Sequence, residues 1–98
     1  MGISISIHNQ VHEKVETIAG VTAATLPSIV DSASPGSLIE GIHLYADTMF
    51  NSYQLKYLLQ ELTALNPTTD SERMVVSEVR RAAETAISQQ GYLWFSGD

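Results

Sequence analysis

The chain contains no cysteine among its 98 residues. Disulfide bridges, thiolate nucleophiles and zinc sites built on cysteine are therefore excluded. The hydrophobic core has to carry the fold, and a hydrophobic content of 44% is ordinary for a folded domain. At this length we expect one domain over residues 1–98.

Basic residues are scarce. Five Lys and Arg stand against eleven Asp and Glu, which gives a net charge of −6. None lies between Lys14 and Lys56, and residues 1–50 alone carry −4 because five acids face one lysine. Such a surface repels phosphate groups, so we expect no binding to nucleic acid, and it attracts a more basic protein partner.

Long apolar runs and phosphate-binding glycine loops are missing as well. The longest uncharged stretch, from Thr17 to Val30, is too short and too polar to span a bilayer, and we expect no membrane association. Gly36 and Gly41 are isolated and do not precede a helix that carries a lysine. No serine lies in a Gly-x-Ser-x-Gly setting.

Two kinds of periodicity predict a helix-rich α+β domain. Residues 3–8 alternate isoleucine with polar residues, and residues 92–96 are rich in strand formers. Apolar residues at helical spacing predict helices over 51–65 and 70–89, the second ended by Gly91. A short turn makes these helices antiparallel, and we expect them to pack on a small sheet that pairs the N-terminal and C-terminal strands.

Residues 10–42 carry weaker patterns. Apolar spacing predicts a short helix over 10–19 that Gly20 stops, and a further helical turn over 26–31. Residues 21–25 fit either a helix or an extended chain.

Short polar residues mark the starts of the long helices. Asn51 with Gln54, and Thr69 with Glu72, have the spacing of a capping box, in which each side chain satisfies a free backbone N–H. Asp47 is expected to be a structural turn or cap residue whose carboxylate accepts backbone N–H groups.

The segment Leu44-Tyr-Ala-Asp-Thr-Met-Phe-Asn51, the leucine helix and the ending Tyr92-Leu-Trp-Phe-Ser-Gly-Asp98 resemble a group of small uncharacterised bacterial proteins. Those proteins carry a Tyr-Gly-Asp-Thr-x-Phe-Asn element before a leucine-rich helix and end near Phe-x-Gly-Asp. Ala46 stands where the group usually has glycine, so a less sharp turn is expected here. The resemblance covers about half of the chain, implies a compact cytoplasmic domain and brings no activity.

Metal and catalytic chemistry lack a complete set of groups. His8 and His12, and likewise His12 and Glu16, are four residues apart, which lets two ligands share a helix face. No third ligand has matching spacing, so we expect no metal and no cofactor. No nucleophile accompanies the carboxylates, so a catalytic role is not expected either.

The leading hypothesis is a non-enzymatic interaction protein that binds a more basic protein, for example an immunity protein that neutralises a bacterial toxin. If Leu93 and Phe95 fill the core, the aromatic side chains between them share a face with Ser4, Ser6 and His8. The alternative is that residues 10–40 fold over that face and bury the tryptophan. The candidate partner-binding residues are Glu13, Glu16, Glu40, Tyr92 and Trp94.

Two other hypotheses stay open. A small enzyme or ligand-binding domain would use His43, Tyr45 and Asp47 around a pocket at the head of the leucine helix. A homodimeric structural or adaptor protein would associate through an exposed helix face or an edge strand.

Overall fold

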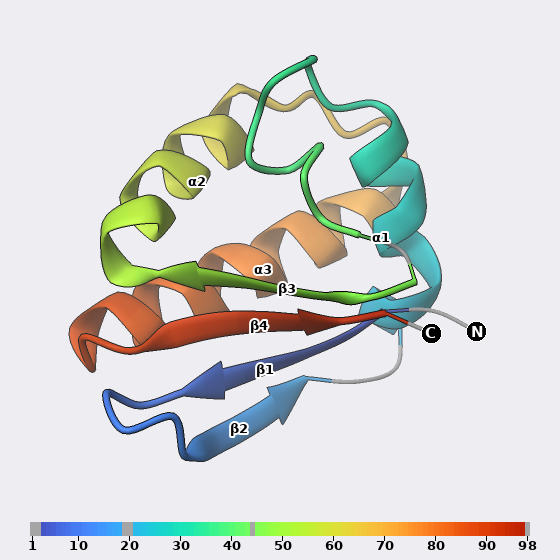
Figure 1. Ribbon diagram of the computed structural model, residues 1–98. Helices are drawn as coiled ribbons and strands as arrows, with labels where there is room; N and C mark the ends of the chain where they lie inside the picture. The colour runs from blue at the N-terminus through green and yellow to red at the C-terminus, as the bar shows by residue number, and fades with distance from the viewer. Residues whose placement is uncertain (1–2, 19–20, 44, 98) are drawn as a thin grey trace.

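The computed structural model describes residues 3–18, 21–43 and 45–97, with residues 21–24 described by their backbone alone. Within these residues three helices cover one face of a four-stranded antiparallel sheet (Figure 1). The strand order β2-β1-β4-β3 confirms an α+β fold in which the N-terminal and C-terminal strands pair. The elements are β1 (Ser4–His8), β2 (Lys14–Ile18), α1 (Val21–Asp31), β3 (Asp47–Asn51), α2 (Ser52–Ala64), α3 (Asp70–Ser88) and β4 (Tyr92–Ser96).

The two central strands build the middle of the core. Ile5 lies opposite Phe95 and Ile7 opposite Leu93, and all four side chains are 0% exposed. Their burial beneath the helices stabilises the fold by roughly 1.5–3 kcal/mol for each side chain. The alternation in residues 3–8 and 92–96 thus correctly predicts which side chains face the helices.

The two long helices also agree with the sequence. Leu55, Leu58 and Leu62 form the buried stripe of α2, and three alanines let α3 lie close to its neighbours. At the start of α2 the capping box is complete: Asn51 Oδ1 accepts from the Gln54 N–H at 2.8 Å, and Gln54 Oε1 accepts from the Asn51 N–H at 3.0 Å. No helix in the described part of the chain has the length and apolar character needed to traverse a lipid bilayer.

The predicted helix over residues 10–19 is wrong, because these residues form a β-hairpin. Asn9 Oδ1 accepts from the N–H groups of Val11 and Glu13 at 3.1 and 3.0 Å, and His12 takes a left-handed backbone with φ 66°. This side-chain turn ends any helical path before β2 begins. Ala19 and Gly20, where the predicted helix would end, lie outside the described residues.

The sheet is also larger than predicted, because β3 adds a strand before α2. Phe50 of β3 is buried and packs edge-on against Phe95, with ring centroids 5.8 Å apart. The helix α1 covers all of residues 21–31, so the extended alternative for residues 21–25 is wrong. Leu44 and Asp98, which belong to the segments that resemble the bacterial group, lie outside the described residues.

The loop between α1 and β3 is fastened to α2 by one carboxylate that the sequence does not reveal. Glu61 accepts from the N–H groups of Leu38 and Ile39, each at 3.0 Å. These bonds position Ile39 and Ile42 in the core, where both side chains are buried. The loop runs between α1 and α2 on the helical side of the sheet (Figure 1).

Candidate protein-binding face

The helices leave one face of the sheet open, and strand register defines its residues. Successive side chains of β1, β3 and β4 point to opposite faces, and a bulge in the β1–β2 pair shifts the register of β2 between Lys14 and Glu16. We call this surface the open face; it consists of Lys14 and Thr17 of β2, Ser4, Ser6 and His8 of β1, Tyr92, Trp94 and Ser96 of β4, and Asp47, Met49 and Asn51 of β3.

Among the described residues of 10–40, the ring of His12 is the part that stacks on this face, and the segment does not bury Trp94. β2 extends the sheet at its edge, and α1 places Leu26 and Ile29 in the core on the helical side (Figure 1). Trp94 is half-buried, and Met49, directly opposite it on β3, is 39% exposed. Among the alternatives weighed from the sequence, the shared face with Ser4, Ser6 and His8 is the one present in the structure.

The imidazole of His8 stacks on the indole of Trp94. The ring centroids are 5.0 Å apart and the planes differ by 15°. His8 Nε2 lies 3.0 Å from Ser6 Oγ, whereas His8 Nδ1 is buried and has no hydrogen-bond partner in the described part of the chain. We assign the proton to Nε2, which can then donate to Ser6 Oγ. The other tautomer would leave an N–H without a partner at the buried Nδ1, whereas this one leaves only an unpaired acceptor there. These contacts hold the indole in one orientation.

A second stack extends the aromatic row. The left-handed turn at His12 brings its ring over Tyr92, with centroids 4.3 Å apart and an interplanar angle of 14°. The sequence places His8 on the face of Tyr92 and Trp94 but suggests His12 only as a metal ligand. The position of His12 beside Tyr92 depends on a hairpin that the sequence does not predict. Glu16, the third member of that set, points to the helical side and pairs with Arg81 at 2.8 Å. Within residues 3–18, 21–43 and 45–97 no cluster of three potential metal-ligating side chains occurs.

The acidic residues suggested for partner binding do not share one surface. Glu13 is exposed in the hairpin that carries His12. Glu40 belongs to the loop between α1 and β3, on the helical side of the sheet, where its carboxylate accepts from the Gly36 N–H at 2.8 Å (Figure 1). The Glu16 carboxylate is engaged by Arg81. Of the five, therefore, Tyr92 and Trp94 lie on the open face and Glu13 lies beside it.

The charges of the open face are few. Its only lysine or arginine is Lys14, on the edge strand β2, because the remaining lysine and the arginines belong to α2 and α3. Asp47 provides the acid on the opposite edge strand. The half of the face formed by β3 and β4 therefore carries a carboxylate and no basic side chain.

Asp47 does not have the turn or cap role expected for it. It begins β3, is exposed, and its Oδ1 accepts from the Ser96 hydroxyl at 3.0 Å. His43 and Tyr45 are exposed as well: His43 Nδ1 accepts from the Tyr45 N–H at 3.1 Å, and the two rings meet edge-on at 6.4 Å. These three side chains line none of the hollows described for this structure.

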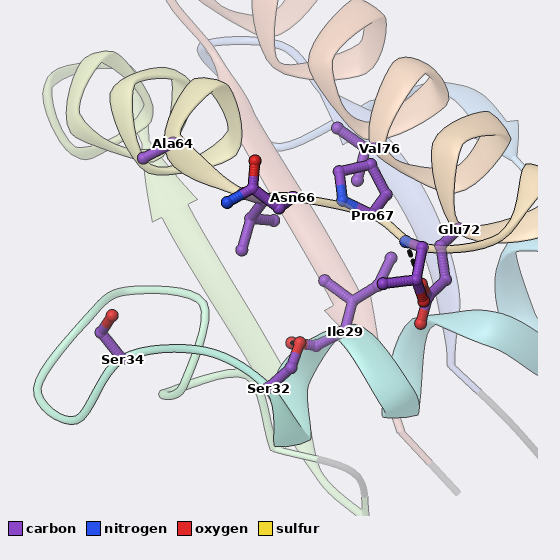
Figure 2. A pocket seen from close by; sticks show the side chains of 10 residues that line it. Ile29, Ser32, Ser34, Ala64, Asn66, Pro67, Glu72 and Val76 are labelled. Atoms are coloured by element: carbon purple, nitrogen blue, oxygen red, sulfur yellow. Dashed lines mark hydrogen bonds between the residues drawn. The ribbon is translucent and has the colours of Figure 1, made fainter.

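A hollow of about 340 Å³ lies between the end of α1 and the turn that joins α2 to α3 (Figure 2). Its walls include Ile29, Ser32, Asn66 and Pro67, and Glu72 is its one ionisable side chain among the described residues. Ser32 turns its hydroxyl to the Ile29 carbonyl at 3.0 Å.

The carboxylate of Glu72 is occupied by hydrogen bonds within the protein. It accepts from the Thr68 N–H and hydroxyl, both at 2.9 Å (Figure 2). It also accepts from the Ser28 hydroxyl at 3.2 Å. The pKa of Glu72 is lowered, chiefly by the hydrogen bond from the Thr68 backbone and next by that from its hydroxyl. Thr69 caps α3, and its Oγ1 accepts from the Glu72 N–H at 3.1 Å. The capping box predicted for this pair is only half formed, because the Glu72 carboxylate bonds chiefly to Thr68. Glu72 thus joins α1 to the α2–α3 turn, which favours a structural role for the hollow.

Comparisons with known proteins add no functional assignment: no family model, curated protein or solved structure matches the chain. A function has to rest on the geometry of the described residues, and the open face is their most distinctive surface.

Proposed function

We propose that this protein is a non-enzymatic binding domain that recognises a more basic protein through the open face. The observation that carries the proposal is the row of half-buried aromatic rings on β4, held by stacked histidines on the side of the sheet that the helices leave uncovered. Large amphipathic rings held in fixed orientations give contact area at a low cost in conformational entropy.

The charge of the chain supports the choice of partner. A net charge of −6 accelerates the approach of a basic protein and weakens that of nucleic acid. An immunity protein that neutralises a toxin is one form of this role, since such a protein blocks a site by surface complementarity. A cytoplasmic subunit or adaptor is another form with the same surface requirement.

The test begins with capture of partners from the source cells on immobilised wild-type protein. The decisive measurement is the affinity of a captured protein for matched variants, taken by calorimetry. We expect Trp94→Ser and Tyr92→Ser each to weaken binding by about tenfold or more. The control is Tyr53→Ser, which removes an exposed aromatic ring from α2 on the helical side. Equal effects of the three variants would count against the open face.

Sedimentation of the pure protein measures its oligomeric state and so tests the homodimer hypothesis. A dimer that dissociates on Trp94→Ser would mean that a second copy occupies the open face, contrary to the proposal. A captured partner that is more acidic than this chain would also contradict it.

A further inference from the structure

We infer that the open face contains a binding site for an arginine side chain, between the indole of Trp94 and the carboxylate of Asp47. The inference rests on the proposed function and names the group by which the basic partner is recognised. It follows from the placement of three side chains along one diagonal of the sheet.

That diagonal is fixed by strand order and register. β4 lies between β1 and β3. His8 is opposite Tyr92, two residues before Trp94, whereas Asp47 is opposite Ser96, two residues after it. His8 and Asp47 therefore lie on opposite sides of Trp94, both across the sheet and along the strand.

The stack with His8 then determines which surface of the indole is available. The planes are within 15° of parallel, so His8 covers the ring surface that is turned toward β1. Because His8 and Asp47 lie on opposite sides of Trp94, the ring surface that His8 leaves uncovered is the one on the side of β3 and Asp47. Met49, the direct neighbour of Trp94 on β3, is unbranched and 39% exposed, so its side chain can move aside.

A guanidinium group fits this space in size and in chemistry. Diagonal neighbours in an antiparallel pair are roughly 7–8 Å apart. A guanidinium stacked on an indole lies within about 6 Å of the ring centroid, and its N–H groups reach a carboxylate at about 2.8 Å. Arginine meets both demands at once because it is planar, weakly hydrated and forked, whereas the compact ammonium of lysine satisfies only the charge.

Asp47 is already oriented for such a contact. Its Oδ1 accepts from the Ser96 hydroxyl at 3.0 Å, which limits rotation of the carboxylate, and no basic side chain of β3 or β4 competes for it. The nearest lysine or arginine on the face, Lys14, belongs to β2, on the far side of β1 from Trp94. The site is therefore prepared for a cation from outside the chain.

The experiment uses a blocked tetra-arginine peptide as the probe and ¹⁵N-labelled protein observed by NMR. Trp94 is the single tryptophan, so its indole N–H gives one resolved signal. We expect the arginine peptide to shift this signal, and tetra-lysine to bind several-fold more weakly. Asp47→Asn should weaken arginine binding about tenfold, and Trp94→Leu at least as much. Binding to Trp94→Leu is followed by the backbone amide signals of β3 and β4, because this variant has no indole N–H.

The matched control is Glu40→Gln, which removes the same charge from an exposed acid in the loop between α1 and β3. It should change the affinity less than twofold. The amide spectrum of each variant reports its fold, and Asp47→Asn keeps an acceptor for Ser96. Equal losses in Asp47→Asn and Glu40→Gln, or equal binding of the lysine peptide, would overturn the inference.

The two proposals fail in different ways. A captured partner that needs Trp94 and Tyr92 but binds Asp47→Asn normally would remove the arginine site and leave the proposed function. A partner that binds every open-face variant normally would remove the proposed function itself.

Discussion

The α-carbon of Gly91 packs against the backbone carbonyl of His8, where β4 starts beside the end of β1. A Cβ added at Gly91 would overlap that oxygen and would approach Asn9 Cα to 3.0 Å. The sequence predicts Gly91 as the residue that ends α3, but the left-handed backbone belongs to Gln90, with φ 54°. Glycine is needed at position 91 for space, because α3 turns into the centre of the sheet there.

Replacing Gly91 by alanine should therefore destabilise the protein by about 3 kcal/mol, since the obstacle is backbone that cannot move without disturbing the β1–β4 pairing. Urea denaturation measures the loss. Gly36→Ala is the control, because Gly36 has φ 83° but nothing within 4 Å of an added Cβ, so only backbone strain of about 1 kcal/mol is expected. Similar losses in the two variants would show that space at Gly91 is not limiting.

Gln90→Gly should have the opposite effect. A left-handed backbone is unfavourable for a residue with a side chain, and glycine adopts it at no steric cost. We expect a gain of roughly 0.5–1 kcal/mol, less a small loss from the exposed Gln10–Gln90 hydrogen bond, and a rise in Tm of a few degrees. The neighbouring Gln89 has an ordinary φ of −93°, so Gln89→Gly should lower Tm. A lower Tm in both variants would contradict this explanation.

The parts of the fold that the sequence predicts are those decided by local pattern. β1 and β4 alternate cleanly, and α2 begins at a cap whose two hydrogen bonds both form within four residues. β2 was hidden because its apolar spacing also fits a helix, and the choice is made by the Asn9 side chain. β3 was hidden because its partner, β4, follows more than forty residues later along the chain.

For the open face, too, the sequence predicts what local pattern decides and misses what distant contacts decide. Alternation in β4 correctly places Tyr92 and Trp94 on one face, since that needs only a period of two. The contribution of His12 and the separation of Glu40 from the face depend on a hairpin and a loop whose positions are set by distant contacts, such as those of Glu61. An acidic composition predicts that a partner is positively charged, but it does not show whether the acidic side chains lie on one surface.

Glu61→Ala should weaken the attachment of the loop between α1 and β3. Two part-buried N–H groups, of Leu38 and Ile39, would lose a charged acceptor, at a cost of about 1–3 kcal/mol. Hydrogen exchange should show faster exchange at these two amides, beyond the change caused by global destabilisation. Glu84→Ala, at an exposed position of α3, should leave their exchange unchanged. Equal exchange at both amides in Glu61→Ala and wild type would refute the anchoring role.

Glu72 should make the stability depend on acid pH. Its pKa is lowered in the folded state by the bonds from Thr68 and Ser28, so the unfolded chain binds a proton first as the pH falls. The stabilisation is fully present above the ordinary pKa range of a glutamate and is lost as the pH falls through the lowered value. The difference in unfolding free energy between wild type and Glu72→Gln should therefore shrink toward acid pH. Glu84→Gln removes the same charge without these bonds, and a parallel trend in that variant would contradict the assignment.

Glu16 shows why an acidic side chain near a binding face needs a stability control. Its carboxylate pairs with Arg81 at 2.8 Å and so links β2 to α3, and this contact raises the pKa of Arg81. Glu16→Lys should therefore lower the unfolding free energy by about 1 kcal/mol, the upper range for an exposed pair, whereas Glu13→Lys should change it little. Salt should reduce the difference, and adding Arg81→Glu to Glu16→Lys should restore part of the stability. If Glu16→Lys weakens partner binding only as far as it destabilises the fold, Glu16 acts by linking β2 to α3 and not by contacting the partner.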